Sequence, residues 1–389
     1  MEELYLQCGA VQCCKEGETL CGDFYTSVSG KNGRTVVLSD GLGSGVKANI
    51  LATLTAKILS TLTNGGLSEE ECVDTVAMTL PVCKVRKLAY ATFTIARFER
   101  GNRLELSQFD NPAAILLRNG KNFDYPSSSR TVNGKEIFHS ALELCEEDTL
   151  VLFSDGVSAA GLGKTTQNGW GREEIVRFLE RWYDPSLSAQ QFAALVARAC
   201  SDLYLSSPDD DCTVLVYRLR PRRAAQMLIG PPENKNDDDR ILRLFFAKEG
   251  YHIVCGGTTA RTVSAYLNKP VEIDRASMSE NIPAKARIEG VDLVTEGVIT
   301  LRALVELGER YRQEPQLCLS FKEEKNAVGA LAELLFEQAS DIHIYFGQAV
   351  NPAHADSDAG ISFQSKLAAV KALEEMLEKM GKRVTLSLC

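Results

Sequence analysis

The segment Ser39–Gly45, with the sequence SDGLGSG, constrains the fold more than any other part of the chain. It follows the apolar run 36–38, Val-Val-Leu, which is typical of a buried strand. An aspartate followed at once by a glycine lies on a turn where the backbone bends sharply or approaches another group closely. Helical periodicity then resumes, and the expected apolar stripe consists of Val46, Ile50, Leu51, Leu54, Ile58, Leu59 and Leu62. The sequence therefore places Asp40 at a strand-to-helix corner, a common position for holding a metal or a phosphate.

The length and charge of the chain narrow its class. Its 389 residues are enough for two domains, each with its own core. A net charge of -9 and a pI near 5.2 argue against nucleic-acid binding and against binding to an anionic membrane surface. The amino-terminal sequence lacks the pattern of a signal peptide, and no apolar run approaches the roughly 20 residues of a membrane helix. We therefore expect a cytoplasmic protein without nucleic-acid or membrane partners, and a homodimer is left open.

Twelve cysteines raise the question of metal or disulfide sites. Cys8, Cys13, Cys14 and Cys21 cluster near the start of the chain, but without the paired C-x-x-C knuckles of a structural zinc site. Most of the others stand alone in apolar runs, where a thiol packs as a small hydrophobic group. The pattern favours free thiols in a reducing compartment over structural zinc.

The chain divides into two regions with different patterns. Up to about residue 220, strand-like runs are grouped around a few helices, which predicts an α+β sandwich for residues 1–220. The polar segment 220–239, interrupted by the apolar run 227–229, marks the boundary. Beyond it, helical and strand patterns alternate and predict a separate α/β domain with a mostly parallel sheet over residues 221–389. Its expected strands are 251–255, 291–295, 341–346 and 384–388, and its expected helices are 238–249, 258–267, 299–312, 326–339 and 362–380.

Four aspartates of the first region lie inside or beside apolar strands: Asp23, Asp40, Asp155 and Asp210. A single aspartate before a glycine is most often a turn cap. If all four converge, each pair of carboxylates at about 4 Å repels by roughly 4 kcal/mol at an effective dielectric constant of 20, so the cluster needs cations. Oxygen donors favour Mg²⁺ or Mn²⁺ over zinc or copper. Two such ions would activate a water molecule for attack on phosphorus.

Four motifs occur in order in this region: Gly22-Asp23-Phe24-Tyr25, Ser39–Gly45, Phe153-Ser154-Asp155-Gly156 and Asp210-Asp211-Cys212-Thr213-Val214. In combination they resemble the PPM metal-dependent serine/threonine phosphatases, and in particular their bacterial branch named after stage II sporulation protein E. The resemblance covers about residues 1–219. It implies a ββ sandwich flanked by helices, two Mn²⁺ or Mg²⁺ ions, a phosphoprotein substrate and a place in bacterial signalling.

The resemblance also implies roles for individual residues. Asp40 would bridge both ions, and the Gly41 carbonyl would help to hold one of them. Asp155 and Asp210 would ligate one ion, which makes Asp40, Asp155 and Asp210 the expected catalytic residues. Asp23 would complete the other ion's site, and Asp211 matches the second acidic position of its motif.

The second region carries a different candidate site. Gly256, Gly257, Thr258 and Thr259 lie between an expected strand and an expected helix, where free N–H groups suit a small anionic ligand such as a phosphate or a nucleotide. Glu296, Asn351 and His354 follow other strands and would line the same crevice at the carboxyl edge of the sheet.

An alternative for this region makes Cys255 a thiolate nucleophile, because its spacing to Arg261 matches the Cys-x5-Arg loop of cysteine-dependent phosphatases. Against it, the same spacing occurs by chance from Cys212 to Arg218, inside an expected strand.

The leading hypothesis is therefore a two-metal phosphatase acting on phosphoserine or phosphothreonine of a protein, regulated by a ligand of the second domain. Two alternatives remain. The first domain could be a pseudophosphatase that serves as a scaffold, or the second domain could be a phosphate- or nucleotide-binding enzyme regulated by the first.

Overall fold

The computed structural model describes residues 4–30, 33–79, 91–132, 135–349 and 363–389. The chain separates into two compact units, Leu4–Arg220 and Pro221–Cys389. We call these the N-terminal unit and the C-terminal unit and describe each by itself. Within the described ranges, no helix combines the length and the apolar character needed to span a bilayer.

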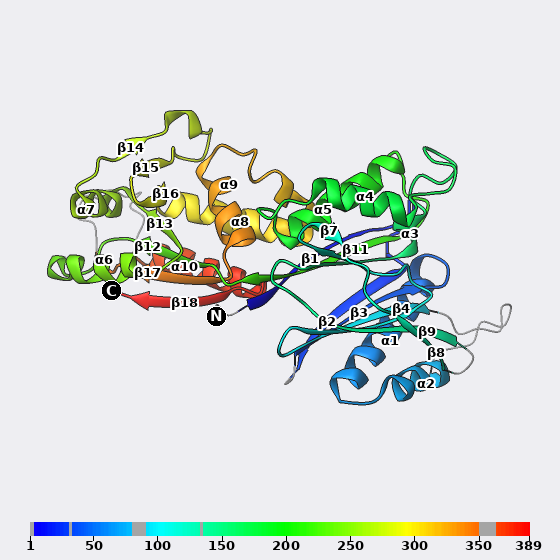
Figure 1. The fold of residues 1–389 in the computed structure, drawn as a ribbon. Helices are drawn as coiled ribbons and strands as arrows, with labels where there is room; N and C mark the ends of the chain where they lie inside the picture. The colour runs from blue at the N-terminus through cyan, green and yellow to red at the C-terminus, as the bar shows by residue number, and fades with distance from the viewer. Residues whose placement is uncertain (1–3, 31–32, 80–90, 133–134, 350–362) are drawn as a thin grey trace. The chain divides into compact units, whose positions relative to one another are not determined.

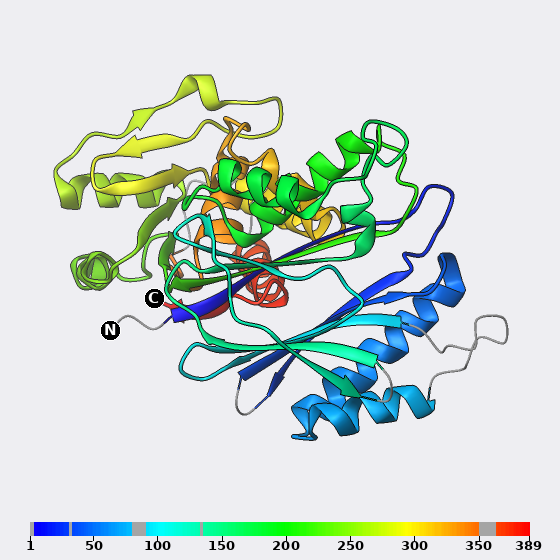
Figure 2. The ribbon, with the colours of Figure 1, turned by 45° about the vertical axis from the view of Figure 1, so that its right-hand side comes forward.

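The N-terminal unit is built on two sheets with helices on their outer faces. The described strands form one sheet in the order β2-β3-β4-β5-β9-β8 and another in the order β1-β11-β10-β6-β7. Helices α1 and α2 cover the first sheet, and α4 and α5 cover the second (Figures 1 and 2). In chain order the elements are β1 (Leu4–Cys13), β2 (Asp23–Gly30), β3 (Gly33–Gly41), α1 (Gly45–Asn64), α2 (Glu69–Thr79), β4 (Ala91–Glu99), β5 (Arg103–Phe109), β6 (Ile115–Arg118), β7 (Lys121–Asn122), β8 (Ser128–Val132), β9 (Lys135–Glu143), β10 (Thr149–Phe153), α3 (Asp155–Ser158), α4 (Arg172–Trp182), α5 (Ala189–Leu203) and β11 (Cys212–Pro221).

Strand β3 shows why this layered arrangement suits the sequence. Successive side chains of a strand point to opposite faces of the sheet. Val36 and Leu38 enter the core between the two sheets, together with Leu152 and Leu215 of the facing sheet. Val37 points the other way, into the core beneath α1 and α2. A strand covered on both faces needs an uninterrupted apolar run, which accounts for residues 36–38.

The predicted apolar stripe on α1 is wrong at Val46, Ile50 and Leu54. It is confirmed at Leu59, which is buried, and at Leu51, Ile58 and Leu62, which pack against the same core. Val46, Ile50 and Leu54 are 57%, 51% and 43% exposed, whereas the buried face is made mainly of small residues: Gly45, Ala48, Ala52, Thr55, Ala56, Ser60 and Thr63, with Leu59. The physical reason is the close approach of the helix to β3. A Cβ atom on Gly41 would lie 2.0 Å from the Ala48 carbonyl oxygen, so only small side chains fit between them.

The C-terminal unit is an α/β unit. Its described strands form one sheet in the order β14-β15-β16-β13-β12-β17-β18, in which the pairs from β16 to β18 are parallel. Its elements are β12 (Ala224–Ile229), η1 (Lys235–Asp237), α6 (Asp238–Ala247), β13 (Tyr251–Cys255), α7 (Gly257–Leu267), β14 (Glu272–Ile273), η2 (Arg275–Ser277), β15 (Ala286–Ile288), β16 (Val291–Thr295), α8 (Val298–Gln313), η3 (Pro315–Leu319), α9 (Ala327–Ala332), the π-helical turn η4 (Glu333–Gln338), β17 (Asp341–Phe346), α10 (Phe363–Lys379) and β18 (Arg383–Leu388).

The predicted fold class, a sandwich followed by an α/β unit with a mostly parallel sheet, is confirmed. Strands 251–255, 291–295 and 341–346 have the predicted bounds. Within the polar segment 220–239, the structure has a strand that was not predicted: Ala224–Ile229 forms β12, which pairs with both β13 and β17. The chain begins this sheet at β12, adds β13 and β16 on one side, and then adds β17 and β18 on the other. This is the strand order of a doubly wound sheet, in which ligands bind at the carboxyl ends of the strands.

We predict that the close contact between α1 and its sheet controls the stability of the N-terminal unit. Ala52→Leu inserts a larger side chain at a fully buried position and is expected to lower the free energy of unfolding by about 1–3 kcal/mol. Ile50→Ala removes an exposed side chain and should change it by about 0.5 kcal/mol or less. Urea denaturation of both full-length variants measures the difference, and a larger loss for Ile50→Ala would contradict the assigned helix face.

Candidate metal centre

Two of the predicted carboxylates lie opposite each other on neighbouring strands. Asp23 begins β2 and Asp40 is the next-to-last residue of β3, and the antiparallel register pairs them directly. Asp23 is 1% exposed and Asp40 is half-buried. The Gly41 amide donates to the Gly22 carbonyl at 3.2 Å, so the turn after β3 is anchored to the residue that precedes β2.

The other sheet supplies Asp155 and Asp210. Asp155 begins α3, directly after β10, and Asp210 precedes β11, the antiparallel partner of β10. Asp155 is exposed and Asp210 is half-buried. The four aspartates therefore come from strand ends of both sheets, and each of Asp23, Asp155 and Asp210 is close enough to Asp40 to affect its ionisation.

A chain of hydrogen bonds joins the two sheets at this point. The Ser154 hydroxyl accepts from the Thr213 amide at 2.9 Å, and the Thr213 hydroxyl donates to Asp23 Oδ2 at 2.7 Å. Gln12 Nε2 donates to the Thr213 hydroxyl at 3.0 Å and to the Asp23 carbonyl at 3.1 Å. These contacts fix the orientation of Asp23 against β11.

The sequence interpretation gave no role to Ser154, Thr213 or Gln12. Ser154 and Thr213 lie inside the quoted motifs, so a signal for them was present. Gln12 lies in β1, outside every motif, and its place beside Asp23 depends on the pairing of distant strands.

Burial and mutual repulsion disfavour the charged forms of these carboxyls. Burial, opposed by the hydrogen bond from the Thr213 hydroxyl, raises the pKa of Asp23 to about 7. Burial and the charges of Asp23 and Asp155 raise the pKa of Asp40 to about 9. Burial also raises the pKa of Asp210, with a further contribution from the charge of Asp155.

The donor set fits a hard divalent cation. Asp23 Oδ1 is buried and has no hydrogen-bond partner among the described residues, which is costly for a carboxylate oxygen unless a cation satisfies it. Glycines keep the surrounding backbone close: a Cβ on Gly156 would lie 2.2 Å from the Asp211 carbonyl oxygen. Asp23, Asp40, Asp155 and Asp210 could therefore hold Mg²⁺ or Mn²⁺, the cations that bind oxygen ligands.

Asp211 differs from the other four. Its Oδ1 accepts from the Lys15 amide at 2.9 Å, in the loop between β1 and β2. Among the described residues, Asp211, Cys14 and Cys21 each offer one ligand atom, and these three atoms lie within 4.8 Å of one another. Consecutive residues, Asp210 and Asp211, thus contribute to different surroundings.

The C-terminal unit brings together several of its predicted ligand-binding residues. Gly256 precedes α7 with φ 111°, in a region that favours glycine, and its Cα lies 3.8 Å from a Cβ built on Gly297, the neighbour of Glu296. Gly257 and Thr258 are exposed at the amino terminus of α7. The buried Thr259 Oγ1 and Glu296 Oε2 have no hydrogen-bond partner among the described residues. Asn351 and His354 lie outside the described residues.

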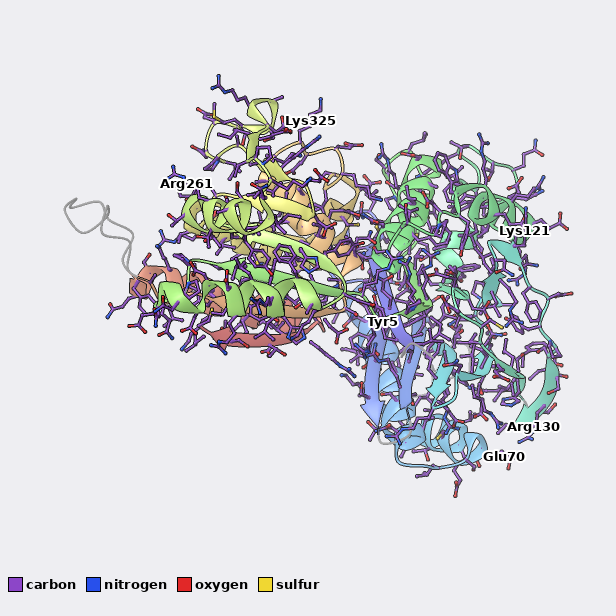
Figure 3. All side chains as sticks on the ribbon, turned by 60° about the vertical axis from the view of Figure 1, so that its left-hand side comes forward. Tyr5, Glu70, Lys121, Arg130, Arg261 and Lys325 are labelled. Carbon is purple, nitrogen blue, oxygen red and sulfur yellow. The ribbon has the colours of Figure 1, made fainter. Side chains whose placement is uncertain are left out.

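The structure argues against Cys255 as a nucleophile. Cys255 is 1% exposed, and burial raises the pKa of its thiol to about 12. Its Sγ accepts a hydrogen bond from the Thr295 hydroxyl at 3.3 Å. Arg261 lies on the exposed surface of α7 (Figure 3). A buried neutral thiol cannot attack a substrate in solution.

The comparisons with known proteins agree with the motifs of the N-terminal unit. The family model described as Stage II sporulation protein E (SpoIIE) matches residues 31–220. This confirms the predicted resemblance to that branch of the PPM phosphatases. A search of curated protein sequences gave no match.

The matches among solved structures include phosphatase domains. The phosphatase domain of SpoIIE from Bacillus subtilis, with a fragment of its regulatory domain, has a TM-score of 0.49 at 19% identity; the match covers 57% of this chain and 65% of that chain, just under two thirds of its length. The RsbU and RsbW domains of a Mycobacterium tuberculosis protein have a TM-score of 0.47 at 15% identity over 62% and 70%. RsbX in complex with magnesium has a TM-score of 0.37 at 17% identity over 56% and 100%.

We predict that the metal-free protein loses stability as pH rises from about 4 to about 9. In this range the folded state binds more protons than the unfolded state, because the pKa values of Asp23 and Asp40 are raised to about 7 and about 9 by folding. The free energy of unfolding therefore falls with increasing pH. In a chelator, we expect the Tm at pH 9 to lie about 5 °C or more below that at pH 6.

Asp40→Asn removes one ionising group and should flatten this decline in thermal denaturation, whereas the exposed Asp124→Asn control should follow the native chain. Equal slopes for the native chain and Asp40→Asn would show that Asp40 does not carry the effect.

Proposed function

We propose that the N-terminal unit is a metal-dependent phosphatase that hydrolyses phosphoserine or phosphothreonine on a protein, and the match of the SpoIIE family model to residues 31–220 supports this. The observation that carries the proposal is the convergence of Asp23, Asp40, Asp155 and Asp210 from both sheets, with a buried Asp23 oxygen that has no partner among the described residues. A scaffold without catalysis has no need to keep such a destabilising group of carboxylates.

The described contacts support distinct roles for these residues. Asp40 interacts with Asp23, Asp155 and Asp210, which suits the shared ligand of two Mn²⁺ or Mg²⁺ ions. Asp23 is oriented by the Thr213 hydroxyl and is almost fully buried, which suits a fixed ligand. The exposed Asp155 leaves its side of the centre open to a large substrate such as a phosphoprotein. When bound, the ions would supply Lewis-acid activation of water for attack on phosphorus.

The decisive test of this proposal is metal-dependent hydrolysis. We expect the full chain to hydrolyse p-nitrophenyl phosphate and a phosphothreonine peptide with added Mn²⁺ or Mg²⁺, and to lose this activity in a chelator. Asp40→Asn should reduce kcat by at least about a hundredfold, the scale of loss for one preorganised electrostatic group.

Asp124→Asn changes an exposed carboxylate away from the four aspartates and should retain activity. If the folded native chain has no activity with either ion, the pseudophosphatase alternative replaces this proposal. Activity that survives both chelation and Asp40→Asn would exclude the metal mechanism.

We propose further that the C-terminal unit binds a small anionic ligand that regulates the phosphatase. The supporting observation is the buried Thr259 hydroxyl without a partner among the described residues, beside the amino terminus of α7. Helix amino termini bind anions through free N–H groups, and the site lies at the carboxyl edge of a parallel sheet. The neighbouring Glu296 carboxylate favours a ligand that also donates hydrogen bonds, such as a nucleotide or a sugar phosphate.

A thermal-shift screen of the full chain with nucleotides and sugar phosphates tests this second proposal. A Cβ at Gly257 would meet no atom within 4 Å, so Gly257→Val should fold and occupy the space where the ligand would lie. We expect a stabilising ligand to lose its effect in Gly257→Val and to keep it in Ala265→Val, an exposed position farther along α7. A ligand that stabilises both variants equally binds elsewhere.

The same ligand should change the rate of phosphopeptide hydrolysis if the C-terminal unit is regulatory. Turnover of the ligand itself, altered by Asp40→Asn, would instead favour the alternative of a C-terminal enzyme regulated by the N-terminal unit.

A further inference from the structure

The loop of residues 14–22, between β1 and β2, encloses the side chain of Asp211. The Lys15 amide donates to Asp211 Oδ1 at 2.9 Å, and the Glu16 amide donates to the Pro208 carbonyl at 2.8 Å. On the other side of the loop, Asn49 Nδ2 of α1 donates to the Cys21 carbonyl at 2.8 Å. The loop is therefore fixed both to the segment before β11 and to α1.

Two thiols of this loop face the enclosed carboxylate. Cys14 Sγ, Cys21 Sγ and one carboxylate oxygen of Asp211 lie within 4.8 Å of one another. Both cysteines are free thiols, Cys14 exposed and Cys21 buried. Gly22 lets the carboxylate approach, since a Cβ there would lie 2.7 Å from Asp211 Oδ2.

The Asp211 side chain also has an unsatisfied atom at this place. Asp211 is only 3% exposed, and its Oδ2 has no hydrogen-bond partner among the described residues. A buried carboxylate oxygen without a donor is destabilising unless a cation or a donor from outside the described set satisfies it. The Asp211 charge also interacts with those of Asp23 and Asp210, so two further carboxylates lie nearby.

We propose that Cys14, Cys21 and Asp211 form a site for one thiophilic divalent cation, Zn²⁺, distinct from the aspartate centre. Two sulfur ligands and one carboxylate select zinc over Mg²⁺, which takes only oxygen ligands. Around a tetrahedral zinc ion such ligands stand about 3.5–3.8 Å apart, so the observed cluster closes with a movement of about 1 Å. The exposed position of Cys14 permits that movement, and binding transfers the two thiol protons to water.

This assignment differs from the role that the sequence motif suggests for Asp211. The Asp211 carboxylate lies beside the Cys14 and Cys21 thiols, while its charge also acts on Asp23 and Asp210 of the aspartate centre. Asp210 and Asp211 are joined by a hydrogen bond from the Asp211 amide to Asp210 Oδ1 at 3.0 Å. The proposed zinc site, which includes Asp211, is therefore next to the aspartate centre, which includes Asp210. The zinc proposal does not depend on phosphatase activity.

The test uses the full chain with Zn²⁺ and with Co²⁺ as a spectroscopic substitute. We expect one tightly bound Zn²⁺ per chain and a thiolate-to-cobalt charge-transfer absorption. Cys14→Ser should weaken Zn²⁺ binding by more than about tenfold and reduce the absorption. Changing a residue that only contacts a metal ligand already lowers metal affinity by about tenfold or more, and removing a ligand should lower it further. Cys145→Ser, at another exposed cysteine of the same unit, should leave both unchanged.

A second pair of variants separates this site from its neighbours. Asp211→Asn should weaken Zn²⁺ binding while leaving both thiols, whereas Asp40→Asn should keep the cobalt absorption even where it removes hydrolysis. Loss of hydrolysis with the absorption intact in Asp40→Asn would support a separate zinc site. Loss of the cobalt absorption in Asp40→Asn would place the cation in the aspartate centre and overturn the separate site.

Alkylation of the native chain gives a measurement that needs no variant. Zn²⁺ should slow the reaction of Cys14 with iodoacetamide, read by mass spectrometry, and leave the rate at Cys145 unaffected. Equal rates at Cys14 with and without Zn²⁺, or unchanged Zn²⁺ affinity in Cys14→Ser, would overturn the zinc site. The zinc site would also be overturned if, after reduction and exposure to air, a Cys14–Cys21 disulfide formed equally fast with and without Zn²⁺.

Discussion

Repulsion among buried carboxylates is the constraint on which the N-terminal unit depends. Asp23 and Asp40 are paired across β2 and β3, and Asp155 and Asp210 approach them from the second sheet. Hydrophobic burial between the sheets, through side chains such as Leu38 and Leu152, supplies the free energy that keeps these charges together. Two hydrogen bonds donated by Thr213, from its amide to Ser154 and from its hydroxyl to Asp23, then determine how the sheets meet. The apolar core between the sheets thus offsets the repulsion among the four carboxylates, and a few hydrogen bonds fix their orientation.

The four aspartates could be singled out from the sequence because the pattern that marks them is local. An aspartate between a buried strand and a glycine can be recognised from a few neighbouring residues, as is the case for both Asp40 and Asp155. The buried face of α1 could not be predicted in the same way. Periodicity identifies where apolar residues recur, but Ala48 and Ala52 are buried because the helix approaches β3 at Gly41, and this distance is a tertiary property.

The cysteines illustrate a second limit. Cys14 and Cys21 are seven positions apart and lack a metal-binding spacing, so the sequence favoured free thiols. Their common partner, Asp211, lies far along the chain and reaches them only because β11 and the loop after β1 meet. Likewise, β12 was not predicted as a strand, because polar residues flank a short apolar run. A strand that is covered on both faces and paired on both edges needs only that run.

The position of β12 has a consequence for how the C-terminal unit is made. It is the first strand of that unit to leave the ribosome, yet its two neighbours are β13, which follows soon, and β17, which begins about 120 residues later. At about 5–20 residues per second, the edge of Met227–Ile229 that pairs with β17 stays without its partner for several seconds of translation. An apolar strand edge left open for that time is a template for wrong pairing, so the yield of folded chain should depend on how the cell shields this edge during synthesis.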